Sequence, residues 1–255
     1  MDPATLIGIG VAFAVIITAN VLEGGNPASM LLLPPMLLVF GATLAVCLAG
    51  GTLADAKASA QALVRAFTAK APSAKDSVPT LVSLAEKARR EGLLSLEDQL
   101  KGVDDPFLVR GVTLAIDGTD PDELREILEG EVHAKRGDDK QAAKFFADAG
   151  AYAPTIGIVG TVMGLVHVLE NLAEPEKLGH LIAAAFLATL WGVLSANVLW
   201  LPIASRLKRL SELEANRMEL VIEGIAAIQA GSNPRVVQMK LTSLLPAGQR
   251  EAEAA

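Results

Sequence analysis

The chain has 255 residues, of which 51% are hydrophobic, and its mean hydropathy is +0.41. This composition is too apolar for an ordinary soluble domain. The formal net charge is −7, and the many Asp and Glu residues in 55–148 argue against a nucleic-acid-binding surface. The single cysteine, Cys47, excludes an internal disulfide or a cysteine-based metal cage.

Four runs of sequence contain no Asp, Glu, Lys or Arg, and they cover residues 3–22, 27–54, 149–169 and 178–205. Each run reaches the roughly 20 residues that a helix needs to cross about 30 Å of hydrocarbon. Because backbone amides in lipid must be satisfied within the segment, each run is predicted to be a transmembrane helix. The alternative, very apolar helices buried in a soluble core, is disfavoured by the number of such runs.

The predicted fold class is therefore an all-α integral membrane protein with four transmembrane helices. Residues 1–54 form a first transmembrane hairpin, 55–148 a helical cytoplasmic domain, 149–205 a second hairpin, and 206–255 a cytoplasmic extension of the fourth helix with a tail. Of the 22 Lys and Arg residues, 14 lie between the second and third runs and 7 follow the fourth. The positive-inside rule places both blocks, and with four spans both termini, in the cytoplasm.

Glycine and proline mark the ends of several predicted elements. A turn outside the membrane is expected at residues 23–27, and Pro34-Pro35 should kink or delay the second helix, which then runs past Gly50-Gly51. Cytoplasmic helices are predicted over 54–69, from 77 to a break at Gly92, and over 206–230. Three more are predicted to begin at Ser95, with an approximate capping box to Asp98, at residues 104–106, and at residues 119–122. The last of these runs toward 136–137.

No motif for catalysis or metal binding is present. The sequence lacks a nucleophile elbow, a P-loop lysine and a zinc-binding pair, so no catalytic residue, metal ligand or cofactor is expected and the chain is not predicted to be an enzyme. Gly157, Gly160 and Gly164 have the spacing of a phosphate loop but lie in an apolar run without lysine. Close helix packing explains them better.

The third and fourth runs each carry one face of small residues with a single threonine. On helical spacing the two faces comprise Pro154, Gly157, Thr161, Gly164 and Val168, and Ala185, Thr189, Gly192, Ala196 and Leu199. One interpretation is helix packing, with each threonine bonded back to its own helix. The other is a groove for a partner, or the lining of an ion path.

An ion path built from these faces would lack its own charge. Ions crossing a bilayer are usually handled by ionisable side chains, and these two runs contain only His167 and His180, both near run ends. A path formed by this chain therefore needs a carboxylate from another subunit.

Several stretches resemble the MotA/TolQ/ExbB proton channel family, and within it the flagellar stator subunits of the MotA type. The resemblance covers nearly the whole chain and is carried by residues 22–25, 38–44, 88–97, 152–165 and 222–234. It implies a pentamer around two copies of a MotB-type subunit, whose membrane helix brings an aspartate. Ion flow would then turn the ring against the rotor protein FliG.

The same resemblance assigns roles to single residues. Arg89 and Glu97, with the adjacent Arg90, match charged residues that engage the rotor. Pro154 and Pro202 match two prolines near the ion path, and we expect them to kink the third and fourth helices into an inner gate. Thr189 matches a pore-lining threonine, and Thr161 lies where the group varies between Thr and Ala; Gly157, Gly164 and Gly192 are assigned to the same lining.

Three functions stay open at this point. The first is the flagellar stator subunit, and the second is an ExbB/TolQ-type subunit that energises a periplasmic or outer-membrane system. The third is a membrane scaffold without transport. A two-span N-terminal hairpin favours the first over the second, and the paired threonine faces weigh against the third. The translocated ion is predicted to be H⁺, because protons are the usual ion of the group that the chain resembles, with Na⁺ as the alternative.

Overall fold

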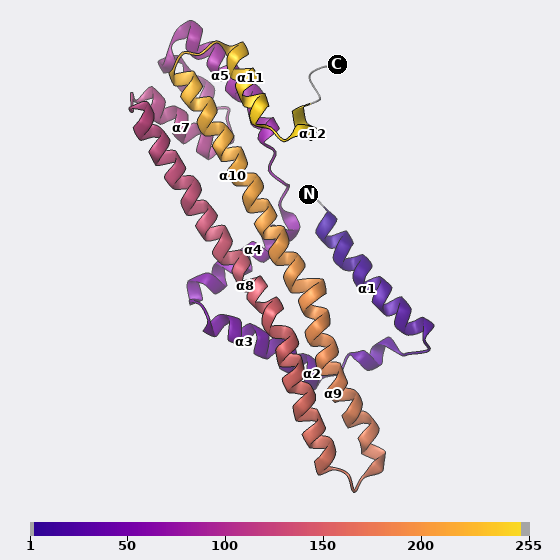
Figure 1. Cartoon of the computed structure of the whole chain (residues 1–255). Coiled ribbons are helices and arrows are strands. Elements are labelled where there is room, and N and C mark those ends of the chain that lie inside the picture. Colours follow the sequence, from indigo (N-terminus) through magenta and orange to yellow (C-terminus); the bar gives the residue numbers. More distant parts are fainter. Residues whose placement is uncertain (1–2, 251–255) are drawn as a thin grey trace. The chain divides into compact units, whose positions relative to one another are not determined.

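The computed structural model describes residues 3–250, and these form helices, turns and loops without any strand (Figure 1). The predicted all-α class is confirmed. Contacts divide the chain into two compact units, each built from two separated stretches. The first unit comprises residues 1–70 and 139–208, and the second comprises residues 71–138 and 209–255.

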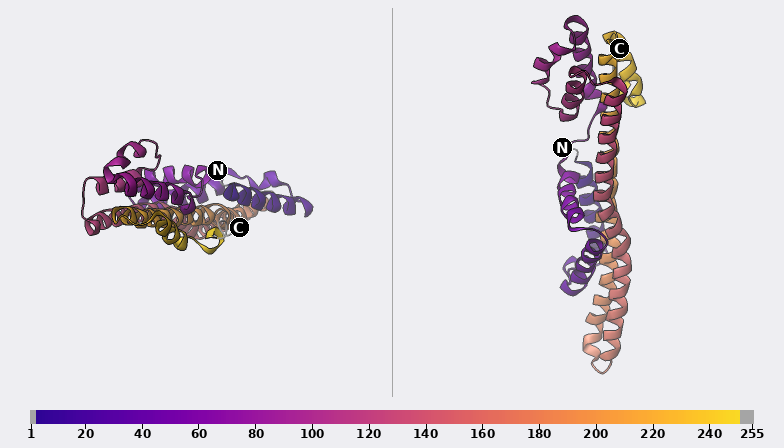
Figure 2. Two further views of the ribbon diagram at one scale, coloured as in Figure 1. Left: turned by 90° about the horizontal axis from the view of Figure 1, so that it is seen from above. Right: turned by 90° about the vertical axis from the view of Figure 1, so that its left-hand side faces the viewer.

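The first unit contains the helices that are apolar enough for a membrane. Its elements are α1 (Ala4–Leu22), η1 (Pro27–Met30), α2 (Leu33–Met36), η2 (Leu37–Gly41), α3 (Ala42–Ala49), α4 (Leu53–Thr68), the C-terminal part of α8 (Pro121–Glu170), α9 (Pro175–Ser195), η5 (Ala196–Trp200) and the first residues of α10 (Leu201–Gln229). Within it, α9 returns alongside α8 as an antiparallel hairpin (Figures 1 and 2).

Three described helices are long and apolar enough to cross a bilayer: α1, α8 and the continuous helix over residues 175–229. The second apolar run forms a shorter helix, Leu33–Ala49, with a π-helical turn over Leu37–Gly41. At 1.5 Å per residue this helix is about 25 Å long. The prediction that it continues past Gly50-Gly51 is wrong, because the helix ends there and α4 starts with a capping box between Thr52 and Asp55.

Helix α4 packs against α8 and α10 within its own unit. Its buried Ala66 joins a cluster with Phe146 of α8 and Leu207 of α10. Arg65 adds two hydrogen bonds from its guanidinium to Asp139, at 2.6 and 3.4 Å. An apolar contact and a bidentate ion pair together hold α4 against α8.

The second unit has a separate core. Its elements are η3 (Ala74–Ser77), α5 (Val78–Glu91), η4 (Leu93–Ser95), α6 (Leu96–Leu100), α7 (Pro106–Ile116), the N-terminal part of α8, most of α10, α11 (Pro234–Leu244) and α12 (Ala247–Arg250). Leu81, Leu128 and Ile225 are among its fully buried side chains. Gly224 lets α10 approach α5, since a Cβ there would lie 2.7 Å from Leu81 Cδ1.

Local signals predicted most helix ends correctly. Asp105 caps α7 by accepting hydrogen bonds from the N–H groups of Phe107 and Leu108, and α8 begins at Pro121 as expected. Gly92 ends α5 with φ +82°, and α10 ends just before Gly231. These positions carry a side-chain cap, a helix-starting proline or a positive-φ glycine, all of which act within a few residues.

Two further local predictions are wrong. Ser95 forms no capping box with Asp98: its hydroxyl donates to the Gly92 carbonyl at 2.7 Å, and Asp98 pairs with Lys101 at 2.6 Å. Helix α8 does not end near 136–137 but continues to Glu170. Gly137 costs only about 1 kcal/mol in a helix, and the contacts of both flanking segments outweigh that cost.

Candidate functional site

The two predicted threonines meet at the contact between α8 and α9. Thr161 Oγ1 and Thr189 Oγ1 are 2.5 Å apart. Thr161 Oγ1 also lies 2.9 Å from the Ala185 carbonyl and 3.2 Å from the Gly157 carbonyl, while Thr189 Oγ1 is 3.3 Å from the latter. The result is a cluster of two hydroxyl and two carbonyl oxygens, with two protons to share.

The predicted glycines bring the two helices close enough for this contact. A Cβ on Gly157 would lie 2.7 Å from the Ala188 carbonyl oxygen, and one on Gly192 would lie 2.6 Å from the Ala153 carbonyl oxygen. A Cβ on Gly164 would lie 2.6 Å from Ala185 Cβ. The two small-residue faces therefore pack against each other within one chain, as small residues do in membrane helix pairs. That these residues also line an ion path remains a prediction.

The two predicted prolines occupy different helical surroundings. Pro154 lies inside α8, which is assigned as continuous α-helix, and its Cα is close to the position a Gly192 side chain would take. Pro202 is the second residue of α10, and only Leu201 separates it from the π-helical turn Ala196–Trp200. A wider turn before a proline relieves the clash of its ring with the preceding carbonyl. Their role in an inner gate stays a prediction.

The residues predicted to contact a rotor lie in the second unit, around the end of α5. Arg89 and Arg90 are exposed in its last turn, and Glu97 is exposed in the first turn of α6. The turn that begins at Gly92 separates the two helices, so the positive charges lie just before this turn and the negative charge lies just after it. Within residues 3–250 none of these three side chains forms an ion pair.

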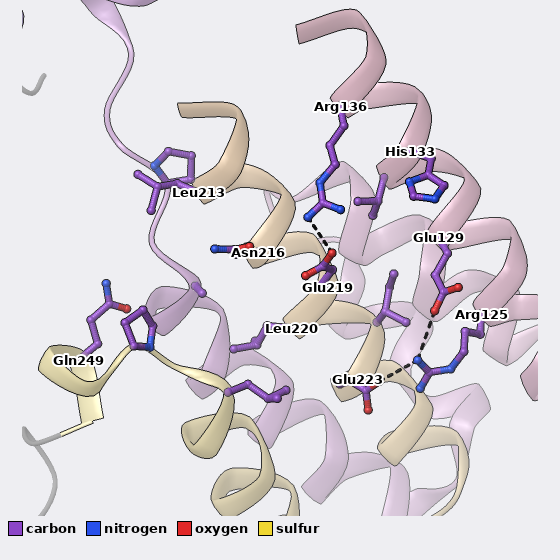
Figure 3. A pocket seen from close by; sticks show the side chains of 16 residues that line it. Arg125, Glu129, His133, Arg136, Leu213, Asn216, Glu219, Leu220, Glu223 and Gln249 are labelled. Atoms are coloured by element: carbon purple, nitrogen blue, oxygen red, sulfur yellow. Dashed lines mark hydrogen bonds and ion pairs between the residues drawn. The ribbon is translucent and has the colours of Figure 1, made fainter. Parts of the chain in front are cut away.

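The second unit also contains a groove of about 560 Å³, shown in Figure 3. It lies between α8 and α10, and its charges pair with each other: Arg125 with Glu223 at 2.7 Å and Glu129 at 3.4 Å, and Arg136 with Glu219 at 2.8 Å. The hydrogen bond from Arg125 holds the pKa of Glu223 below its usual value. No residue predicted for ion transport or rotor contact lines this groove.

Two features of the site could not be read from the sequence. One is the Ala185 carbonyl, which accepts from Thr161 across the helix pair. The other is Trp191, whose indole bonds to the backbone of Met30. A tryptophan in an apolar run indicates only burial, and nothing local identifies its acceptor. In the described part of the chain no group of three or more His, Cys, Asp or Glu side chains could hold a metal ion.

Comparisons with known proteins agree along the whole chain. A model of the MotA/TolQ/ExbB proton channel family matches residues 99–220, and a model of the motility protein A N-terminal region matches residues 6–92. Motility protein A of Bacillus subtilis is 38% identical over 98% of this chain and 93% of its own length. Chemotaxis protein PomA of Vibrio alginolyticus is 33% identical, with 99% of each chain covered.

A solved structure supports the same relationship. A chain of the flagellar MotAB stator complex from Bacillus subtilis superposes with a TM-score of 0.91 and 35% identity, over 99% of this chain and 100% of that one. The similarity in fold and sequence therefore extends over nearly the whole chain. The chain belongs to the MotA/TolQ/ExbB proton channel family, with the motility protein A relatives.

Proposed function

We propose that this chain is the ion-conducting subunit of a bacterial flagellar stator, in which several copies surround a MotB-type partner. The match over full length to motility protein A and to a chain of the MotAB stator complex carries this proposal. The ring is a pentamer around two partner chains. The ion-bearing carboxylate is an aspartate in the partner's membrane helix.

The composition of the α8–α9 hairpin supports a partner-supplied charge. Residues 149–169 and 178–205 contain no Asp, Glu, Lys or Arg, whereas the hydroxyls of Thr161 and Thr189 supply neutral oxygen atoms. Oxygens of this kind can replace part of an ion's water or hold a water chain, but they carry no charge themselves. An acidic side chain from elsewhere completes such a path.

The proposed topology has four spans in the cell membrane with both termini in the cytoplasm. Helix Leu33–Ala49 is the second span, and its short length fits a bilayer once flanking residues are included. The clusters of basic residues in 57–144 and 206–250 then face the cytoplasm. In that compartment Arg89, Arg90 and Glu97 are free to contact the rotor protein FliG.

The proposed ion is H⁺, in keeping with the family to which the chain belongs. A direct test expresses the chain with its partner in cells lacking their own stator and measures swimming speed. We expect speed to be independent of external sodium and to collapse with a proton uncoupler. Speed that rises with sodium and survives the uncoupler would replace H⁺ by Na⁺.

The same cells test the stator function itself. Swimming restored by the pair of chains, and absent with either one alone, is the expected result. If the pair leaves the cells immotile but restores an energy-dependent outer-membrane process, the ExbB/TolQ-type function replaces the stator. If the pair reaches the membrane and restores neither process, a scaffold without transport is the better description.

A further inference from the structure

Helix α9 is contacted on two opposite faces by elements of its own unit. Thr189 and Trp191 are two residues apart, which corresponds to about 200° around a helix. The face with Thr189 packs on α8 through Thr161 and Gly157. The face with Trp191 packs on the segment that precedes and begins the second apolar helix.

Trp191 is held by a hydrogen bond and by ring packing. Its Nε1–H donates to the Met30 carbonyl at 2.7 Å, and its ring centroid is 5.9 Å from that of Phe40. The side chain is 9% exposed and lies in a cluster with the fully buried Val39. A buried indole N–H normally has a partner, so this bond is part of what keeps the ring in place.

The acceptor is available because the chain is not α-helical at this point. Leu31 and Leu32 have ψ values of 61° and 124°, and α2 begins only at Leu33. The Met30 carbonyl therefore lies outside the series of helical hydrogen bonds. A buried carbonyl without a donor is costly, particularly in a membrane, and the indole of Trp191 supplies the donor.

Trp191 and Thr189 therefore belong to one turn of α9 that is fixed from both sides. We infer that Trp191 is a positioning residue of the ion path, holding the Thr189 hydroxyl against Thr161 through its bond to Met30. The inference rests on the proposed function, because it assumes that the threonine pair takes part in ion flow. Loss of the Trp191–Met30 bond releases one face of α9 and thereby loosens the 2.5 Å contact between Thr189 and Thr161 on the opposite face.

The test replaces Trp191 by Phe, which keeps an aromatic ring and removes the N–H. Torque is measured on single motors as stator units join one at a time, so that torque per unit is separated from the number of units. One hydrogen bond of about 1 kcal/mol corresponds to about a fivefold change, and we expect Trp191→Phe to lower torque per unit by about two- to fivefold. The number of units should stay the same.

Trp200 provides a matched control in the same helix. Its Nε1 is buried and has no hydrogen-bond partner in residues 3–250, so Trp200→Phe removes an N–H that holds nothing. We expect wild-type torque per unit from this variant. An equal loss in both variants would show a general need for indole rings, and would overturn the positioning role.

A second combination separates positioning from structural support. Serine in place of Thr189 keeps the hydroxyl but lacks the methyl group that restricts its rotation. In this Thr189→Ser background, Trp191→Phe should lower torque per unit by less than it does alone. Unchanged torque in Trp191→Phe, or a loss only in the number of units, contradicts the inference. Failure of the unaltered chain to restore rotation would instead refute the proposed function.

Val39→Ala serves if Trp191→Phe does not enter motors. Val39 is fully buried in the cluster with Trp191, so shortening it loosens the packing that keeps the indole in place. A smaller loss of torque per unit in the same direction is expected. Wild-type torque per unit in Val39→Ala would overturn the inference without use of the tryptophan variant.

Discussion

At the scale of single residues, the chain separates neutral oxygens from charges. Thr161 and Thr189 form a hydroxyl pair at a helix contact, and neither can hold a charge near neutral pH. The exposed charges Arg89, Arg90 and Glu97 lie in the other compact unit, where water surrounds them. In the proposed function, ion handling and rotor contact therefore fall to different residues with different chemistry.

We expect Arg89→Glu to reduce swimming speed at least severalfold while leaving the amount of the chain in the membrane unchanged. The reason is electrostatic: the variant repels a partner surface that the arginine attracts, and charge pairs across an interface govern association and specificity. Speed and membrane content are measured in the same cells. Arg235→Glu, an equal charge change at an exposed residue of α11, is the control and should swim normally. Normal swimming of Arg89→Glu would remove this residue from the rotor interface.

At the scale of elements, α8 and α9 approach each other closely because glycines at their contact carry no side chains. The backbone of α9 occupies the space where Gly157 would carry a Cβ, and the backbone of α8 does so at Gly192. A third element joins them, because Leu38 Cδ2 approaches the Cβ position of Gly160 to 2.8 Å. The small-residue faces are therefore contact surfaces between α8 and α9.

Gly157→Ala should therefore impair the motor by separating α8 from α9. The added methyl group would lie 2.7 Å from the Ala188 carbonyl oxygen and 3.1 Å from the Thr189 Cα. Both are backbone atoms, which cannot turn away as a flexible side chain would. Overpacking of this kind typically costs about 1–3 kcal/mol. Thermal unfolding of the purified complex with its partner should show the loss, as should torque per stator unit. Gly179→Ala in α9 has open space at its Cβ and should match the unaltered chain; equal losses in both variants would exclude the proposed steric cause.

At the scale of the whole molecule, each compact unit uses its own means of cohesion. The first relies on apolar and glycine contacts and on the Arg65–Asp139 ion pair between helices, while the second has several ion pairs across helices α7, α8, α10 and α11 beside its apolar core. Glu223 is central there, since it pairs with Arg125 and, at 2.7 Å, with Lys240 of α11. Its carboxylate links three helices of one unit.

The lowered pKa of Glu223 predicts how acid affects the second unit. The main cause is the hydrogen bond from Arg125, with that from Lys240 also favouring the charged form. Because the folded pKa lies below the unfolded one, the stabilisation is complete above the usual carboxyl range and is lost as pH falls through the folded pKa. Glu223→Gln should lower stability at pH 7 by roughly 1–2 kcal/mol and flatten the decline toward low pH.

The measurement is thermal unfolding of the purified complex at pH 7 and at successively lower pH. Glu129→Gln is the matched control, because this more exposed carboxylate pairs with the same Arg125 at the longer distance of 3.4 Å. Exposed pairs contribute about 0–1 kcal/mol, so little change is expected. A Glu223→Gln curve parallel to that of the unaltered chain would show that this carboxylate does not contribute to the acid response.

The sequence by itself determined the helical class, the apolar runs and most helix ends, because caps such as Asp105, breaks such as Gly92 and runs of uncharged residues act over a few residues of chain. It also placed Thr161 and Thr189 on small-residue faces. Only the tertiary structure decided that these faces meet each other, and that Trp191 bonds to a carbonyl 161 residues away. Such pairings depend on which helices pack together, which local sequence does not specify. The length of α8 is a second example, because local signals predict an end near Gly137, whereas tertiary contacts of the segments before and after this residue keep the helix continuous.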